Sequence, residues 1–134
     1  MSSRVLIFGT FDRLHPGHRF LLEEAGKRGE LFVVVARDAN VKRIKGKDPA
    51  ESEEDRKAAI EKVFPDARVL LGDPHNFLAP LATAKPDLIL LGYDQKLPPG
   101  VAMEDLPCPV ERLPSFHPEK YKSSLGKGDL NRSK

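Results

Sequence analysis

The sequence has a single cysteine, Cys108, among its 134 residues. One thiol excludes an internal disulfide and any zinc cluster built from cysteines. A chain that does without disulfides is typical of a reducing compartment, so we expect a cytoplasmic protein. At this length one domain can bury a hydrophobic core that is stable without disulfide bonds or structural metal ions.

Long apolar runs are also missing. The longest, Leu31–Ala36, spans six residues, whereas a helix needs about 20 to cross a bilayer. We therefore expect no membrane contact. Hydrophobic residues make up 40% of the chain and charged residues 31%, which is typical of a folded domain rather than a disordered chain.

The chain carries little excess charge. Its net charge is +2, and the tail, residues 126–134, has the same net charge because Lys127, Arg132 and Lys134 outnumber Asp129. The preceding 125 residues therefore balance to zero, whereas a nucleic-acid-binding domain usually has a basic excess on its folded part. We expect no nucleic-acid partner and interpret the tail as solvated and frayed.

Apolar segments alternate with helix-like segments along residues 1–125, which we interpret as one domain. Short apolar runs predict buried strands, and apolar residues at helical spacing predict helices. The expected strands are 5–8, 31–36, 68–71, 88–91 and 110–113, and the expected helices are 17–27, 52–64 and 74–84. Pro80 is expected to weaken or kink the last helix. Strand–helix alternation predicts an α/β fold, a Rossmann-like doubly wound sheet of about five parallel strands.

Three segments fit this pattern less well. Residues 38–50 are polar, carry four basic side chains and lack helical periodicity, so we expect a long loop there. Residues 97–109 are rich in proline, which excludes a full crossover helix, although Val101–Leu106 could form one or two turns. Residues 119–125 are expected to form a short helix.

The turn after the first strand combines residues suited to phosphate. Gly9 permits a tight turn and close approach of a ligand to the backbone. The helix that begins near Gly17 directs free amide groups and its positive dipole end toward the same turn. His15 and His18 are three residues apart and share a helix face. Both imidazoles can therefore donate hydrogen bonds to phosphate oxygens that gain charge in a transition state.

Each of these features also has an ordinary explanation. A lone histidine near a helix start is usually a surface or capping residue, and a strand–glycine–helix turn occurs throughout this fold class. The two histidines could ligate a metal, but no third His or Cys lies at useful spacing, so we expect no protein-held metal. Only the combination of the features is specific.

The run Gly9-Thr10-Phe11-Asp12, followed by His15-x-Gly17-His18, resembles the identifying motif of the cytidylyltransferase-like nucleotidyltransferases. It stands directly after the first expected strand, where that family carries it. Further segments resemble the archaeal FAD synthases, which are FMN adenylyltransferases. They are residues 36–41, 44–47, 71–74, 91–95 and 116–124. The likeness covers about residues 4–125.

The resemblance implies roles for individual residues. The catalytic residues would be His15, His18 and Lys45. The nucleotide would contact Gly9, Thr10, Phe11, His15, Pro16, Gly17, His18, Lys47, Asp94, Tyr121, Ser123 and Ser124. Arg56 resembles another conserved basic position, although it could equally be a surface arginine of its helix. On composition alone the basic residues of segment 38–50 would be a solvated loop, but their place after the second strand favours contact with phosphate.

The reaction that the resemblance implies is attack of an FMN phosphate oxygen on the α-phosphorus of ATP, with Mg²⁺ accompanying the triphosphate and pyrophosphate leaving. A cytidylyltransferase acting on glycerol-3-phosphate or a related phosphate ester is the first alternative. It is disfavoured because segment 118–124 lacks the arginine that cytidylyltransferases carry five residues before the position of Ser123. A nucleotide-binding sensor module without turnover is the alternative from another class. The oligomeric state stays open, a homodimer included.

Overall fold

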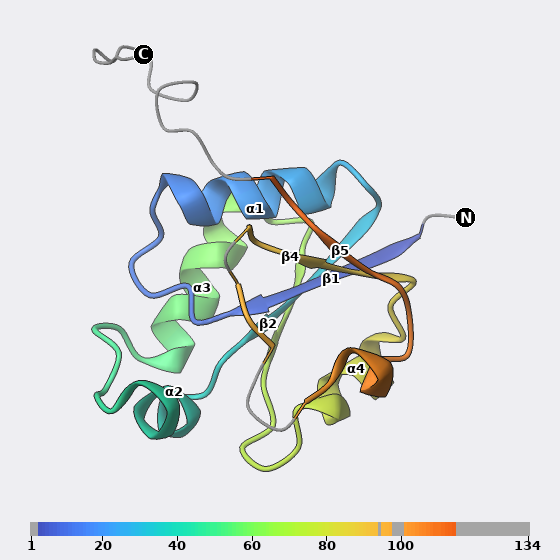
Figure 1. Cartoon of the computed structure of the whole chain (residues 1–134). Coiled ribbons are helices and arrows are strands. Elements are labelled where there is room, and N and C mark those ends of the chain that lie inside the picture. The colour runs from blue at the N-terminus through green and yellow to red at the C-terminus, as the bar shows by residue number, and fades with distance from the viewer. Residues whose placement is uncertain (1–2, 94, 98–100, 115–134) are drawn as a thin grey trace.

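The computed structural model of the chain describes residues 3–93, 95–97 and 101–114. Within them, one five-stranded sheet has the order β3-β2-β1-β4-β5, and every pair of neighbouring strands is parallel (Figure 1). The strands are β1 (Arg4–Gly9), β2 (Glu30–Val35), β3 (Arg68–Leu71), β4 (Leu88–Leu91) and β5 (Val110–Arg112). The predicted Rossmann-like parallel sheet is confirmed.

Helices cover both faces of this sheet. They are α1 (Pro16–Gly26), α2 (Asp38–Lys45), α3 (Glu53–Val63) and α4 (Leu78–Ala84). Figure 1 shows α1 and α3 on one side of the sheet and α4 on the other. Between β4 and β5 the described residues form only a single 3₁₀ turn, η1 (Met103–Asp105), which agrees with the expectation of no full crossover helix there.

The strands are continuous apolar runs because both of their faces are buried. In β1, Val5 and Ile7 belong to the core cluster that contains residues of α1 and α3. Leu6 and Phe8 point the other way, into the cluster that contains residues of α4. A central strand of a doubly covered parallel sheet needs apolar residues at every position, and this accounts for the pattern seen in the sequence.

The prediction of a loop over residues 38–50 is wrong for its first part, because residues 38–45 form α2. The helix buries only Val41, so its sequence shows almost no apolar periodicity. A side chain from α3 stabilises the first turn of α2, because the Asp38 amide donates a hydrogen bond to the Glu53 carboxylate at 2.8 Å. Its basic last turn suits the negative end of the helix dipole, and Gly46 ends it with a φ of 81°.

The helix expected over residues 74–84 begins later than predicted, at Leu78. The residues before it form a turn in which the Asp73 carboxylate accepts hydrogen bonds from two backbone amides, each at 2.8 Å. Pro80 therefore lies in the first turn of α4, where a backbone N–H has no partner within the helix. For this reason Pro80 does not interrupt α4, and the expectation that it would weaken or kink the helix is wrong.

The short helix expected at 119–125 and the tail 126–134 lie outside the described residues. The domain boundary at residue 125 accordingly stays a prediction. In the part of the chain that the structure describes, no helix is long and apolar enough to cross a membrane.

Candidate active site

A cleft of about 1390 Å³ opens at the carboxyl ends of the strands. The chain runs outward from β1 to β2 and β3, then restarts on the other side with β4, so the cleft lies at the switch point where ligands of parallel sheets bind. Typical small-molecule pockets measure roughly 300–1,000 Å³. This cleft is therefore large enough for two ligands together.

Most of the predicted site residues line this cleft. They are Gly9, Thr10, Phe11, His15, Pro16, Gly17, His18 and Lys45. Lys47 is exposed in the connection after α2 and is not among the lining residues. Asp94, Tyr121, Ser123 and Ser124 lie outside the described residues. The structure thus brings the part of the predicted site that follows β1 together with Lys45 of α2, which follows β2.

The rings of His15 and His18 stack on each other, with centroids 3.6 Å apart and planes 20° from parallel. His15 is also the N-cap of α1: its Nδ1 accepts hydrogen bonds from the amides of Gly17 at 3.1 Å and His18 at 3.4 Å. The expectation that these amides are free for phosphate is therefore wrong. Because Nδ1 is the acceptor, the proton of a neutral His15 is on Nε2, which can donate to a ligand.

His18 is half-buried, and its Nδ1 has no hydrogen-bond partner in the described part of the chain. Burial, followed by the neighbouring His15 and Lys45, lowers the pKa of His18 from 6.5 to about 4. Its imidazole is consequently neutral near pH 7. The ring meets Phe11 edge-on at 5.4 Å, and Phe11 itself is only 2% exposed, so Phe11 mainly supports the site from the core.

The turn between β1 and α1 contains backbone strain. Phe11 and Arg13 both have a φ of 53°, the left-handed region that costs a residue with a side chain about 1 kcal/mol or more. The Asp12 carboxylate between them accepts hydrogen bonds from the amides of Ala50 at 2.8 Å and Glu51 at 2.9 Å. The connection before α3 therefore holds the strained turn in place.

The same carboxylate is kept ionised by its partners. Burial alone would raise the pKa of Asp12, but the hydrogen bonds from the Ala50 and Glu51 amides and the positive charge of Arg56 outweigh it, so the pKa is lowered. The motif contains this aspartate, yet the sequence offered no signal that its role is to bind backbone amides.

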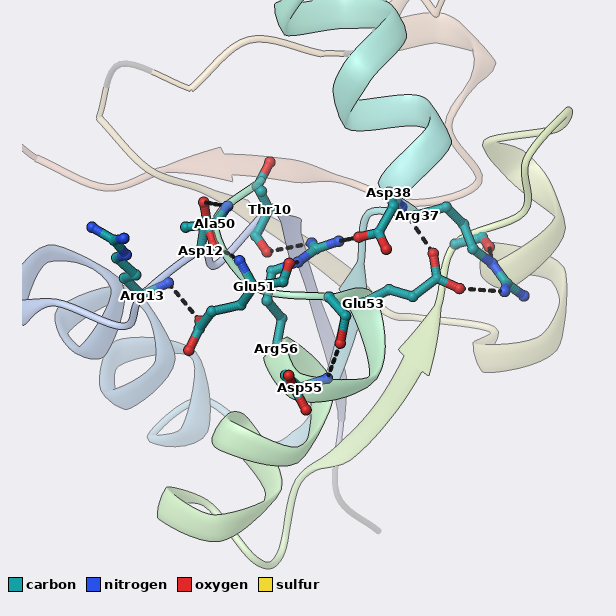
Figure 2. A network of polar contacts seen from close by, with 12 residues as sticks. Thr10, Asp12, Arg13, Arg37, Asp38, Ala50, Glu51, Glu53, Asp55 and Arg56 are labelled. Atoms are coloured by element: carbon teal, nitrogen blue, oxygen red, sulfur yellow. Dashed lines mark hydrogen bonds and ion pairs between the residues drawn. The ribbon is translucent and has the colours of Figure 1, made fainter. Parts of the chain in front are cut away.

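Arg56 of α3 is fully buried and joins three segments, as Figure 2 shows. It donates to the carbonyl oxygens of Thr10 at 2.8 Å and Glu51 at 3.1 Å, and it forms an ion pair with Asp38. The surface-arginine alternative for this position is therefore wrong. Arg56 does not line the cleft, and its contacts instead connect the turn between β1 and α1 to the start of α2.

A second arginine extends this network beyond α2. Arg37 donates to the Glu53 carboxylate at 3.0 Å (Figure 2). It also donates to the Gly72 carbonyl oxygen, after β3, at 2.7 Å. Glu53 also accepts the Asp38 amide. Sequence reasoning treated Glu53 only as an acidic residue favourable in a first helical turn, because nothing in the pattern shows which distant groups it meets.

Two basic residues of α2, Arg43 and Lys45, line the cleft. Lys45 is the last residue of the helix, and its charge contributes to the lowered pKa of His18. Lys42, on the same helix, is exposed and is not a lining residue. Of the four basic side chains of segment 38–50, Arg43 and Lys45 therefore line the cleft, whereas Lys42 and Lys47 do not.

Two side chains organise the wall after β4. Gln95 lies in a segment that carries the family resemblance but was given no role, and Arg112 was missed by sequence reasoning. Gln95 donates to the Phe8 carbonyl oxygen at 2.6 Å and accepts the Gly92 amide at 3.0 Å. Arg112 of β5 donates to the carbonyl oxygens of Gly92 at 2.9 Å, Tyr93 at 3.2 Å and Gln95 at 2.7 Å. These bonds fix the backbone that faces the cleft on this side.

Comparison with known proteins agrees with this site. The model of the cytidylyltransferase-like family matches residues 6–115. The FAD synthase of Methanopyrus kandleri is 48% identical over 101 residues, which cover 72% of this chain and 67% of that protein. The FAD synthase of Methanosphaerula palustris is 43% identical over 104 residues, which cover 77% of this chain and 67% of that protein.

Two solved structures share the fold. One, described as a lipopolysaccharide core biosynthesis protein from Thermoplasma volcanium, is 35% identical with a TM-score of 0.75, covering 87% of this chain and all of that one. A protein of unknown function from Archaeoglobus fulgidus is 17% identical with a TM-score of 0.57, covering 66% of this chain and 68% of that one, a likeness of fold alone. The family match over most of the chain and the stacked histidines beside the cleft show that this protein belongs to the cytidylyltransferase-like family of nucleotidyltransferases.

Proposed function

We propose that the protein transfers AMP from ATP to FMN and forms FAD and pyrophosphate. The observation that carries the proposal is the stacked pair His15 and His18 at the switch point of a cleft large enough for two substrates. The two FAD synthases at 43–48% identity support FMN as the acceptor.

The transfer needs no covalent enzyme intermediate. A phosphomonoester has a second pKa of about 6, so the FMN phosphate is largely a dianion at neutral pH and needs no general base to become a nucleophile. What the site must supply is alignment and stabilisation of the charge that develops on the phosphate oxygens. In this proposal His15, through Nε2, and the neutral His18 donate hydrogen bonds to them; both side chains line the cleft. Lys45 lines the same cleft, and in this proposal its positive charge stabilises the departing pyrophosphate.

Mg²⁺ enters this proposal as part of the substrate, MgATP. No group of three or more His, Cys, Asp or Glu side chains in the described segments is placed to hold a metal ion. The two described acidic residues that line the cleft, Asp73 and Asp105, each accept hydrogen bonds from backbone amides. Such a site suits Mg²⁺ that is ligated mainly by phosphate oxygens and water.

The contacts implied for Lys47, Asp94, Tyr121, Ser123 and Ser124 remain part of the proposal and rest on the family resemblance. The cytoplasmic setting rests on cysteine usage alone.

Product identification tests the proposal. The protein is incubated with Mg²⁺, ATP or CTP, and FMN or glycerol-3-phosphate, and the products are identified by mass. We expect FAD and pyrophosphate from ATP and FMN only. Formation of CDP-glycerol without FAD would instead support a cytidylyltransferase, and the absence of any product with all four pairs would support a nucleotide-binding sensor.

A further inference from the structure

Three rings that follow β1 pack against one another in series. The Phe11 ring meets His18 edge-on, with centroids 5.4 Å apart and planes 64° from parallel, and the His18 ring stacks on His15 at 3.6 Å. Phe11 belongs to the core cluster that contains residues of α1 and α3, whereas His15 is exposed and lines the cleft. The series therefore leads from the core out into the cleft.

A glycine stands at each end of this series. A Cβ added to Gly9 would lie 3.2 Å from Cε2 and 3.3 Å from Cζ of Phe11. A Cβ added to Gly17 would lie 3.0 Å from Cε1 and 3.2 Å from Nδ1 of His15. Ordinary van der Waals contact between carbon atoms is about 3.5–4.0 Å. A larger residue at either position would therefore push on the neighbouring ring.

The need for space at Gly17 comes from the ring of His15 and not from the backbone. Gly17 lies in the first turn of α1 and is not among the glycines with a positive φ, so its backbone conformation suits any residue. The His15 ring folds back over this turn because its Nδ1 accepts the amides of Gly17 and His18. An added Cβ at Gly17 would compete with the ring for the same space.

The orientation of His18 depends on packing. A functional histidine is usually oriented by a hydrogen bond at the ring nitrogen that faces away from the ligand. In His18 the buried Nδ1 has no such partner among the described residues. The ring instead packs against Phe11 and His15. A shift of either neighbour would therefore move it.

We propose that Phe11 and Gly17 are positioning residues for the histidine pair: Phe11 supports His18 from the core, and Gly17 leaves free the space that the His15 ring occupies. The inference rests on the proposed function for what the pair does. Hydrogen-bond donors stabilise a transition state when they already stand at the right positions. A displacement of about 1 Å can lower the rate about 10²-fold.

Gly17→Ala tests one end of the series. It adds the Cβ that would meet the His15 ring, whereas Gly26→Ala adds a Cβ to the same helix at a position where nothing lies within 4 Å. Imidazole ¹H–¹⁵N spectra of the ligand-free proteins report on the two rings, and steady-state kinetics give kcat for FAD formation and the KM for ATP. His15→Asn and His18→Gln assign the two signals.

We expect Gly17→Ala to shift the signals of both histidines and to lower kcat about 10- to 100-fold. The KM for ATP should stay within about threefold, because the variant displaces groups that act in the transition state. Gly26→Ala should leave both signals in place and kcat within about twofold.

Phe11→Leu tests the other end, because leucine leaves part of the space beside His18 unfilled. Burial lowers the pKa of His18, so water that enters this space should raise that pKa toward 6.5, and kcat should fall about tenfold. Phe32→Leu makes the same change at a buried position in the cluster on the other face of the sheet. It should also lower the melting temperature, but leave the pKa of His18 and kcat unchanged.

The inference is wrong if the ligand-free spectra of Gly17→Ala and Phe11→Leu match the wild-type spectrum and only the KM for ATP rises, because both residues would then serve the nucleotide directly. It is equally wrong if the signals move while kcat stays normal, or if the two control variants move the signals as far. The spectra need no substrate. A wild-type protein that makes no FAD would overturn the proposed function, and the spectra would still decide whether Phe11 and Gly17 place the rings.

Discussion

His15 turns its Nδ1 toward the start of α1 and stacks its ring on His18, with the two centroids 3.6 Å apart. One histidine therefore caps the helix and also presents its Nε2 to the cleft. The other is buried deeply enough to stay neutral. The two members of the motif differ in what they do for the fold, and this difference can be measured.

Substitution of His15 should separate its two roles. His15→Ala removes both the cap and the proposed phosphate donor, so we expect a loss of about 0.5–2 kcal/mol in the free energy of unfolding and a fall of about 10²–10³ in kcat. His15→Asn keeps a side chain that caps well, and should recover the stability but not the turnover. Urea denaturation and steady-state kinetics provide the two measurements, and a near-normal kcat for His15→Asn would contradict the phosphate role.

His18 should make the stability of the protein depend on pH. Its pKa in the folded state, about 4, lies below the 6.5 that is ordinary for a histidine, so the unfolded chain binds the proton more readily. The stabilisation is fully present above pH 6.5 and is lost as the pH falls toward 4. Between pH 7.5 and 5.0 this loss amounts to at most about 2 kcal/mol, because the site is partly open to solvent.

The control for this pH dependence is His18→Gln, which does not titrate. Urea denaturation of both proteins at the two pH values cancels the contribution of the carboxyl groups that they share. The wild-type protein should lose more stability than the variant. Equal losses would mean that His18 titrates normally.

Lys45 and Lys42 lie on the same helix, but only Lys45 lines the cleft. We expect Lys45→Ala to lower kcat by about tenfold or more while FMN affinity changes little, because its charge is needed where pyrophosphate develops. Lys42→Ala makes the same charge change outside the cleft and should keep kcat within about twofold. Equal effects of the two variants on kcat would show that Lys45 acts only through overall charge.

Arg56 should be essential to stability. Arg56→Met leaves two part-buried carbonyl oxygens and the Asp38 carboxylate without their partner. The Asp38 side chain is 41% exposed and can be rehydrated, so the main cost is that of the unpaired carbonyl oxygens, about 1–3 kcal/mol each. The next residue of α3, Lys57, forms a partly exposed pair with Glu61, and Lys57→Met should cost no more than about 1 kcal/mol. Urea denaturation compares the two, and a similar small cost for both would refute the role assigned to Arg56.

The sheet could be predicted because its strands are buried on both faces, so that runs such as Leu31–Ala36 stand out from the polar segments around them. The paired histidines could be predicted because the motif is local. α2 could not, since a helix that buries only Val41 has no visible periodicity. The role of Arg56 could not be predicted either. The sequence does not distinguish a buried arginine from an exposed one, and only the structure shows that Arg56 is buried beside its partner Asp38.

The central claim is that the adenylyl group of ATP, which contains the α-phosphorus, moves to FMN. Its most direct test is to supply ATP labelled with ³²P at the α-phosphorus, together with Mg²⁺ and FMN, and to separate the flavin products from the nucleotides. We predict that the label appears in FAD, with one pyrophosphate released for each FAD formed. Label that stays in the adenine nucleotides, as ATP, ADP or AMP, with none in the flavin fraction, would contradict the claim.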